Sequence, residues 1–274
     1  MAKQGEIDYL KNIGDAGVRH AIRKPYGDAD CDRLLMEIGM VLALLPPPPA
    51  RLLDLGCGTG WTSALFARRG YEVVAVDIST DMIEYARQNP DARVSASLQF
   101  EVSDYEDLRF RDEFDCVVFF DALHHAVDEK LAISRAHAAL KQGGTCVACE
   151  PGKGHQDAES SREAVRKWNV TEKDMPPDKI ISMAREAGFR EFKVYPHPYD
   201  LIRAVRQCFD SNALPSFAPA PPPSFRARLK ARLGLVPLPD ESPGFRQLRY
   251  SEAISAMVHQ LASTRDTGVV QLIK

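Results

Sequence analysis

The sequence contains no long hydrophobic run. Nowhere among its 274 residues do about 18 consecutive apolar side chains occur, which is the length that spans a bilayer. The polar N-terminus, MAKQGEIDYL, lacks the basic and then apolar order of a secretory signal. We therefore expect a cytoplasmic protein without integral membrane association.

Cysteine is sparse as well. Six cysteines are scattered at positions 31, 57, 116, 146, 149 and 208, which excludes the dense disulfide framework of a small secreted protein. Cys146 and Cys149 form a CxxC pair, but their odd separation places them on opposite faces of a strand. Because no second CxxC completes a zinc site, we predict reduced thiols and no metal at this pair.

The chain also lacks an excess of charge of one sign. Lysine and arginine number 35 and aspartate and glutamate 38, so the net charge is −3. Without a basic field the chain has no general attraction for polyanions, and we expect a small-molecule partner and no nucleic acid. The 45% hydrophobic content is enough for a sizeable core. The oligomeric state, monomer or homodimer, stays open.

Periodicity divides the chain into parts. Residues 1–49 read as a helical lid of two stretches, and the second ends at the prolines 46–49. From Arg51 short apolar runs alternate with amphipathic segments, which is typical of βαβ units on a parallel sheet. Strands are predicted at Leu52–Leu55, Val73–Asp77, Leu98–Val102, Cys116–Phe120, Thr145–Cys149, Phe192–Tyr195 and Gly268–Lys274, and helices at Thr62–Arg69, Asp81–Gln88, Val127–Leu140 and Asp178–Ala187.

These elements predict an α/β fold with a doubly wound, mostly parallel, seven-stranded sheet. Residues 50–198 would form its core and residues 267–274 its last strand. Between them, residues 199–266 are rich in proline and contain the basic segment 225–233, so we predict a helical insertion that caps the substrate. A solvated surface helix, or one that touches an anionic surface, is the alternative for this segment.

A glycine-rich bend follows the first predicted strand. Asp54-Leu-Gly-Cys-Gly-Thr-Gly60 stands between a strand and a helix, where three glycines let the backbone approach a ligand closely. Asp77 ends the next strand, where a carboxylate can accept hydrogen bonds from ribose hydroxyls; the alternative is a cap for the following helix. A dinucleotide site would have glycine at position 61, where this chain has tryptophan.

With Leu52-Leu-Asp-Leu-Gly-Cys-Gly-Thr-Gly60, the chain resembles the class I S-adenosylmethionine-dependent methyltransferases. Phe119-Phe-Asp-Ala-Leu-His-His125 and Leu140-Lys-Gln-Gly-Gly144 are similar to two further motifs of that family, with Gln142 in place of the usual proline. The resemblance covers roughly residues 50–150. It implies a Rossmann-like fold, S-adenosyl-L-methionine as cofactor and S-adenosyl-L-homocysteine as product.

Carried over by position, the resemblance implies roles for the bend and for three acids. Asp54 and the backbone of residues 56–60 would meet the methionine moiety, Asp77 the ribose, and Asp104 the adenine amino group, unless Asp104 is a turn acid. The expected cofactor contacts are Asp54, Gly56, Cys57, Gly58, Gly60, Trp61, Asp77, Ile78, Met82, Ser103, Asp104, Tyr105, Asp121 and Leu123.

A sulfonium methyl group is already electrophilic, so the chain must mainly position an acceptor and exclude water. For a hydroxyl acceptor, His124 or His125 beyond the fourth strand is a candidate base, and we favour His124. The alternative is that the pair packs against the cofactor. Glu150, Lys153 and His155 are expected to face the substrate, and Tyr9, Lys24 and Tyr26 to be lid contacts.

Asp121, His124, Glu150 and His155 are residue types that bind divalent metals. Spacing does not show that they converge, so we predict no metal. The sequence therefore predicts a small-molecule O-methyltransferase acting on a metabolite, sugar or secondary-metabolite scaffold. A protein or RNA methyltransferase and a non-catalytic cofactor-binding subunit are the alternatives.

Overall fold

The computed structural model describes residues 3–90, 97–203 and 266–274. Residues 1–199 with 265–274 form one compact unit, and residues 200–264 form a second. Almost all of the second unit, with the proposed cap and its basic segment 225–233, lies outside the described residues. No helix among the described residues is long and apolar enough to cross a membrane.

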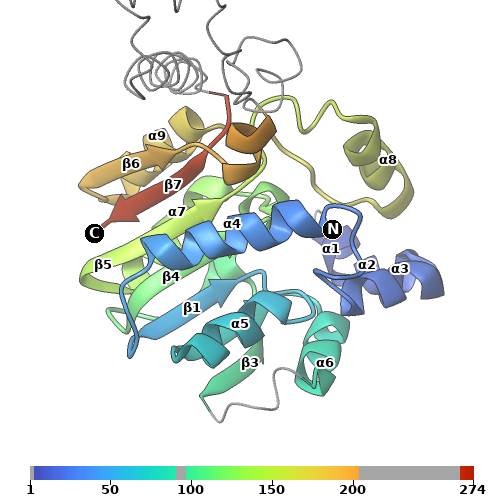
Figure 1. Ribbon diagram of the computed structural model, residues 1–274, viewed down its shortest axis with the longest axis horizontal. Coiled ribbons are helices and arrows are strands. Elements are labelled where there is room, and N and C mark those ends of the chain that lie inside the picture. The colour runs from blue at the N-terminus through green and yellow to red at the C-terminus, as the bar shows by residue number, and fades with distance from the viewer. Residues whose placement is uncertain (1–2, 91–96, 204–265) are drawn as a thin grey trace, which may run out of the picture. The chain divides into compact units, whose positions relative to one another are not determined.

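The first unit is built on one seven-stranded sheet with the order β3-β2-β1-β4-β5-β7-β6 (Figure 1). The strands are β1 (Arg51–Leu55), β2 (Glu72–Asp77), β3 (Leu98–Val102), β4 (Phe114–Phe120), β5 (Leu140–Cys149), β6 (Glu191–Tyr195) and β7 (Val269–Ile273). The strands from β3 to β5 run parallel, and β7 is antiparallel to both neighbours. The predicted doubly wound, mostly parallel sheet is confirmed.

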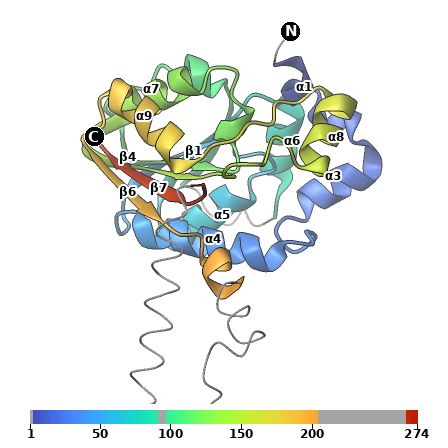
Figure 2. The ribbon, with the colours of Figure 1, turned by 90° about the horizontal axis from the view of Figure 1, so that it is seen from above.

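Helices cover both faces of this sheet, as Figure 2 shows for α4 (Cys31–Leu44) and α5 (Trp61–Arg69) on one side and α7 (Glu129–Ala139) and α9 (Pro177–Ala187) on the other. Strand side chains alternate between the two layers. Leu53 and Leu55 join the core under α7 and α9, whereas Leu52 joins the core under α4 and α5. A buried parallel sheet explains the continuous apolar runs of the sequence.

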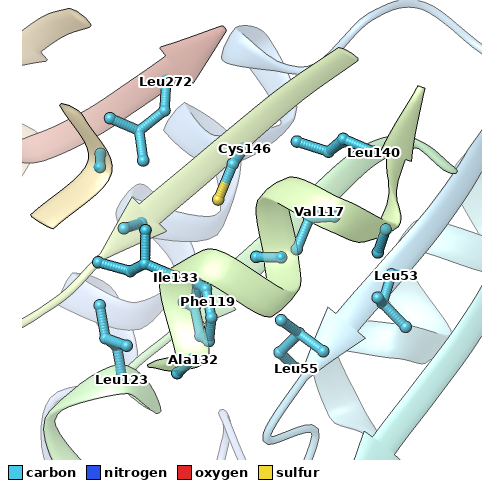
Figure 3. Packing of buried hydrophobic residues seen from close by; sticks show 14 of the residues in the cluster. Leu53, Leu55, Val117, Phe119, Leu123, Ala132, Ile133, Leu140, Cys146 and Leu272 are labelled. Atoms are coloured by element: carbon cyan, nitrogen blue, oxygen red, sulfur yellow. The ribbon is translucent and has the colours of Figure 1, made fainter. Parts of the chain in front are cut away.

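The core under α7 is shown in Figure 3, where Ala132 and Ile133 of the helix approach Val117 and Phe119 of β4. The other core positions of α7 are alanines. Because their side chains end at Cβ, the helix packs close to the sheet. The same packing explains the CxxC pair. Cys146 belongs to this core and Cys149 to the opposite one, so the two thiols lie on different faces, as predicted.

Capping residues fix the helix limits more narrowly than periodicity did. Helix α6 (Thr80–Gln88) begins after Ser79, whose hydroxyl accepts from the Met82 amide, and α7 begins after Asp128, whose carboxylate accepts from the Leu131 amide. The prediction that the latter helix starts at Val127 is therefore wrong by two residues. Gly188 ends α9 in the left-handed conformation, as the sequence predicted.

The N-terminal part contains four helices rather than two stretches. They are α1 (Gln4–Ile7), α2 (Tyr9–Asn12), α3 (Gly14–Ile22) and α4. Helix α8 (Glu159–Trp168) was not predicted, because only Ser161 and Ala164 of it are buried and neither gives a strong apolar period. Figures 1 and 2 show α1, α3 and α8 gathered at one end of the sheet.

Candidate functional site

A cavity of about 520 Å³ lies at the carboxyl edge of the parallel strands, where ligands of open α/β sheets bind. The bend after β1 and the residues that follow β2, β3 and β4 form its floor, and the N-terminal helices and the segment after α8 cover it. Its walls include Lys3, Glu6, Tyr9, His20, Lys24, Gly56, Cys57, Gly58, Trp61, Asp77, Ile78, Met82, Asp104, Tyr105, Asp121, His125, Trp168, Val170 and Glu172.

The bend is held in place by the strand beside it. The amides of Gly56 and Cys57 both donate to the Val76 carbonyl, at 2.8 and 3.0 Å. Gly56 has φ +74°, and a Cβ there would lie 2.6 Å from the Ala122 side chain. Gly58 has φ +53° with open space beside it, so its bare backbone borders the cavity. This is a cradle for a ligand that approaches the main chain.

Asp77 closes the cradle from the end of β2. One carboxylate oxygen accepts from the Gly58 amide and the other from the Ser79 amide, both at 2.9 Å. Two carboxylate oxygens offer about four lone pairs, so acceptor capacity remains for two ribose hydroxyls. Burial raises the pKa of this carboxyl, although the two amide hydrogen bonds oppose that shift. The residues fit an adenosyl ligand.

Asp54 does not line the cavity. It is almost fully buried, and one oxygen accepts from the Thr62 and Ser63 hydroxyls at 2.8 and 2.6 Å, which ties β1 to α5. Burial raises the pKa of Asp54 to about 6, against the lowering effect of both hydroxyls. The structure thus gives this residue a role in holding the bend, and its contact with methionine stays a prediction.

The raised pKa of Asp54 makes the stability pH-dependent. Its folded pKa of about 6 exceeds the ordinary value, so the folded state holds a proton that the unfolded state has released between pH ~4 and ~6. Wild-type stability falls as pH rises through that window, and Asp54→Asn should gain about 3 kcal/mol relative to wild type across it, at about 1.4 kcal/mol per pKa unit. Urea unfolding at several pH values measures this, with the exposed Glu84→Gln as control. A difference in unfolding free energy between Asp54→Asn and wild type that does not change with pH would contradict the prediction.

Asp104 and Tyr105 form the wall beyond β3. Asp104 caps the short 3-10 turn η2 (Tyr105–Asp107), and it makes an ion pair with Lys3 of the N-terminal cover. Lys3 also lies 2.9 Å from Glu106. The Tyr105 hydroxyl donates to the Ala122 carbonyl at 3.0 Å, which joins this wall to the turn after β4. The adenine contact of Asp104 stays a prediction.

Asp121 directly follows β4 and has a strained backbone conformation with φ +48°. Its amide donates to the Cys149 carbonyl at 2.9 Å, and Arg33 of α4 approaches its carboxylate at 3.8 Å. Burial raises the pKa of Asp121, while the Arg33 charge opposes that shift. The strained position directs this carboxylate to the cavity wall.

Glu150 was expected to face a substrate, and the structure contradicts that expectation. It is 1% exposed, and it accepts from the amides of Ala122, Leu123 and His124 and from Nδ1 of the His124 ring at 2.8 Å. Burial raises the pKa of Glu150 to about 7, although the three amides oppose this. Glu150 therefore fixes the turn η3 (Leu123–His125), and its oxygens are not available to the metal site considered from the sequence.

His124 and His125 have different environments, although their ring centroids lie 4.0 Å apart. His124 is buried behind the wall, and burial together with the charge of His125 lowers its pKa well below the usual range. His125 lies in the wall, with Nδ1 2.6 Å from the Thr171 carbonyl and 3.6 Å from Glu6. Burial opposes the charged form, but Glu6 and Glu172 raise the pKa of His125 to about 9. The histidine that borders the cavity is the second, not the favoured first.

Glu172 completes the polar end of the cavity. Its Oε2 lies 2.6 Å from Nε2 of His155 and 3.6 Å from Nε2 of His124. Burial opposes ionisation, but the His155 hydrogen bond and the neighbouring histidine charges lower its pKa. The sequence missed Glu172 and Glu6, because the carboxylates stand in NVTEKD and KQGEI, which carry no motif.

Several other predicted contacts lie outside the wall. Gly60 is the N-cap of α5, the Ser103 amide donates to the Asp77 carbonyl, and Leu123 is buried in the core. Lys153 is exposed and lies 3.8 Å from Asp266, and Tyr26 is 77% exposed, so neither faces the cavity. His155 reaches the site only through Glu172.

The N-terminal helices are fastened over the cavity by hydrogen bonds to the sheet edge. Thr59 donates to the Ala21 carbonyl at 2.8 Å, and Ser79 donates to the Ile7 carbonyl at 3.0 Å. Tyr9 packs edge-on against Trp168 at 5.6 Å between ring centroids. These contacts place the first helices as a cover over the cavity.

Comparison with known sequences agrees with this geometry. Residues 53–148 match the family model of a methyltransferase domain. The chain is similar to ubiquinone biosynthesis O-methyltransferase of Xanthomonas campestris pv. campestris, with 37% identity over 113 residues, 40% of this chain and 46% of that protein. It is also similar to O-methyltransferase cnsE of Penicillium expansum, with 30% identity over 170 residues, 60% and 59% of the two chains. The chain spans about half the length of these curated relatives.

Solved structures agree at the level of the fold. Phosphoethanolamine N-methyltransferase 2 of Haemonchus contortus, in complex with S-adenosyl-L-methionine, has a TM-score of 0.60 with 20% identity, covering 98% of this chain and 59% of that one. An S-adenosylmethionine-dependent methyltransferase of Mesorhizobium loti has a TM-score of 0.51 with 21% identity, covering 68% and 93%. At such identities the likeness concerns the fold alone.

Proposed function

We propose that this chain is a class I S-adenosylmethionine-dependent methyltransferase that transfers a methyl group from S-adenosylmethionine to an oxygen of a small molecule. The match of residues 53–148 to the family model of a methyltransferase domain supports the proposal. One observation carries the proposal. Asp77 at the tip of β2 is tied to the Gly58 amide, so the glycine cradle and the carboxylate border one cavity. An adenosyl group needs both, the carboxylate for its ribose and the bare backbone for the rest.

When bound, S-adenosylmethionine supplies an electrophilic methyl carbon, and the residues of the chain do the positioning. Gly58 leaves room for the ligand, and Asp77 would accept from its ribose hydroxyls. Tyr9 and Trp168 in the cover keep water away from the reacting atoms. Such orientation and exclusion of water account for most of the rate in a reaction with so reactive a donor.

The end of the cavity near β4 and β5 is suited to an oxygen acceptor. Glu6, His125 and Glu172 gather there. When a hydroxyl oxygen bonds to the methyl carbon, the carbon–sulfur bond breaks, its electron pair stays on sulfur, and the hydroxyl proton must leave. A carboxylate in the wall can accept that proton. The similarity to two O-methyltransferases supports oxygen as the acceptor atom.

Transfer of radioactive methyl groups from S-adenosylmethionine to a cell extract, followed by separation by size, tests the proposal. We expect label in small molecules and none in protein or RNA. Label in macromolecules would favour a protein or RNA methyltransferase, and tight binding of S-adenosylhomocysteine with no label anywhere would favour a non-catalytic subunit. The cytoplasmic location, the oligomeric state and the absence of nucleic-acid partners stay predictions.

A further inference from the structure

Three possible metal ligands lie close together at the polar end of the cavity. His124, His125 and Glu172 each place a possible ligand atom within 4.8 Å of the other two. We propose that these residues bind a divalent transition-metal ion, Zn²⁺ in the first place, that holds the oxygen of the acceptor. The role of the ion in holding the acceptor rests on the proposed methyl transfer. The binding of the ion to these three residues does not.

The hydrogen bonds of His124 determine which of its ring nitrogens has a free lone pair. Three backbone amides donate to the Glu150 carboxylate, so Nδ1 of His124, 2.8 Å from the same group, is the ring nitrogen that carries hydrogen. Nε2 of His124 then has a lone pair, and it faces Oε2 of Glu172 at 3.6 Å. A cation between these two acceptors would satisfy both.

Every proposed ligand also has an outer partner, a group that holds it in place from the side away from the ion. Histidine ligands of metals usually donate their other ring N–H to a carboxylate or a backbone carbonyl. His124 donates to Glu150, and Nδ1 of His125 lies 2.6 Å from the Thr171 carbonyl. The third ligand, Glu172, is held at 2.6 Å by His155. The outer partners leave Nε2 of both ligating histidines free for an ion.

The proposed ion site is open to the cavity on one side. His124 is buried, whereas His125 and Glu172 border the cavity, so an ion among them would have its open side toward the acceptor. Two histidines and one carboxylate with open positions suit Zn²⁺ and related ions, and imidazole nitrogen does not suit Mg²⁺ or Ca²⁺. A bound ion would polarise an acceptor hydroxyl and make loss of its proton easier.

Titration of the chelator-treated full chain with Zn²⁺ alone, followed by calorimetry, tests the proposal without cofactor or acceptor. We expect one equivalent to bind. Glu172→Gln should weaken binding at least about 100-fold because an anionic ligand is lost, and His155→Gln about 10-fold because only an outer partner is lost. Should Glu172→Gln fail to fold by circular dichroism, His125→Gln takes its place. Unchanged affinity in the folded variant would overturn the proposal.

A second buried group provides the control. Glu37, Cys149 and His197 also lie within 4.8 Å of one another, and Nδ1 of His197 has no hydrogen-bond partner among the described residues. Co²⁺ distinguishes the two sites, because thiolate ligation gives a charge-transfer absorption in the near ultraviolet. We expect no such absorption and no effect of Cys149→Ser. An absorption that Cys149→Ser removes would assign the ion to the other group and overturn our proposal.

The same samples separate this proposal from the proposed function. Binding of S-adenosylhomocysteine is measured on the metal-free chain and on Glu172→Gln. Zinc binding without S-adenosylhomocysteine binding would remove the methyl-transfer function and leave the metal site in place. Binding of S-adenosylhomocysteine without zinc binding would exclude the metal site and leave the proposed methyl transfer in place.

Discussion

Replacement of Asp77 by alanine is expected to weaken the binding of S-adenosylhomocysteine about 100-fold. The carboxylate would accept two ribose hydroxyls, and hydrogen bonds to a charged group contribute about 1.5–3 kcal/mol each. A loss of about 3 kcal/mol corresponds to about a hundredfold change in Kd. Isothermal calorimetry with the wild type and the variant measures it, and no methyl acceptor is needed.

Two further variants sharpen this test. Asp77→Asn keeps an oxygen that can accept from the Gly58 or Ser79 amide, so it should preserve the bend and lose about tenfold in affinity, since one charged acceptor becomes neutral. Glu84→Ala changes an exposed acid of the neighbouring helix α6 and should leave Kd unchanged. An Asp77→Ala variant with wild-type affinity would exclude Asp77 as the ribose acceptor, and with it the adenosyl site.

Gly60→Ala is expected to lower the free energy of unfolding by about 3 kcal/mol. Gly60 has φ +78°, and a Cβ there would lie 2.8 Å from two ring carbons of Phe100 and 3.0 Å from Ala86. The left-handed conformation costs a non-glycine residue about 1–2 kcal/mol, and crowding in a packed interior adds about 1–3 kcal/mol. Urea unfolding monitored by circular dichroism measures the loss.

Gly58→Ala is the matched control in the same bend. Gly58 also has a positive φ, +53°, but an added Cβ would meet no atom within 4 Å. Only the backbone strain remains, and we expect a loss of about 1 kcal/mol. Equal losses for Gly58→Ala and Gly60→Ala would show that the contact with Phe100 does not determine the cost at position 60.

The bend and its carboxylate were predictable because they depend on chain order alone. Parallel strands end at one edge of a sheet, so the residues after β1 and β2 must be neighbours, and the sequence placed Gly58 and Asp77 together. Asp54 belongs to the same motif, yet its carboxylate turns to Thr62 and Ser63 in the next helix. Side-chain direction within a motif depends on the partners that packing brings near.

Glu150 shows the same limit more clearly. Its position at the end of β5 was foreseen, but three amides of the neighbouring turn satisfy its oxygens, and those amides come from residues about 27 positions earlier. A buried carboxylate is stable there only because of these donors. Chain order could not reveal them.

The sequence by itself determined the strands and most of the helices of the core and the glycine-lined bend beside Asp77, since hydrophobic period and glycine position act locally along the chain. Only the tertiary structure decided the polar end of the cavity. Glu6 comes from the N-terminus, His125 from the turn after β4 and Glu172 from the segment after α8, and no local pattern links residues so far apart. They meet because the N-terminal helices and the segment after α8 close over the same edge of the sheet.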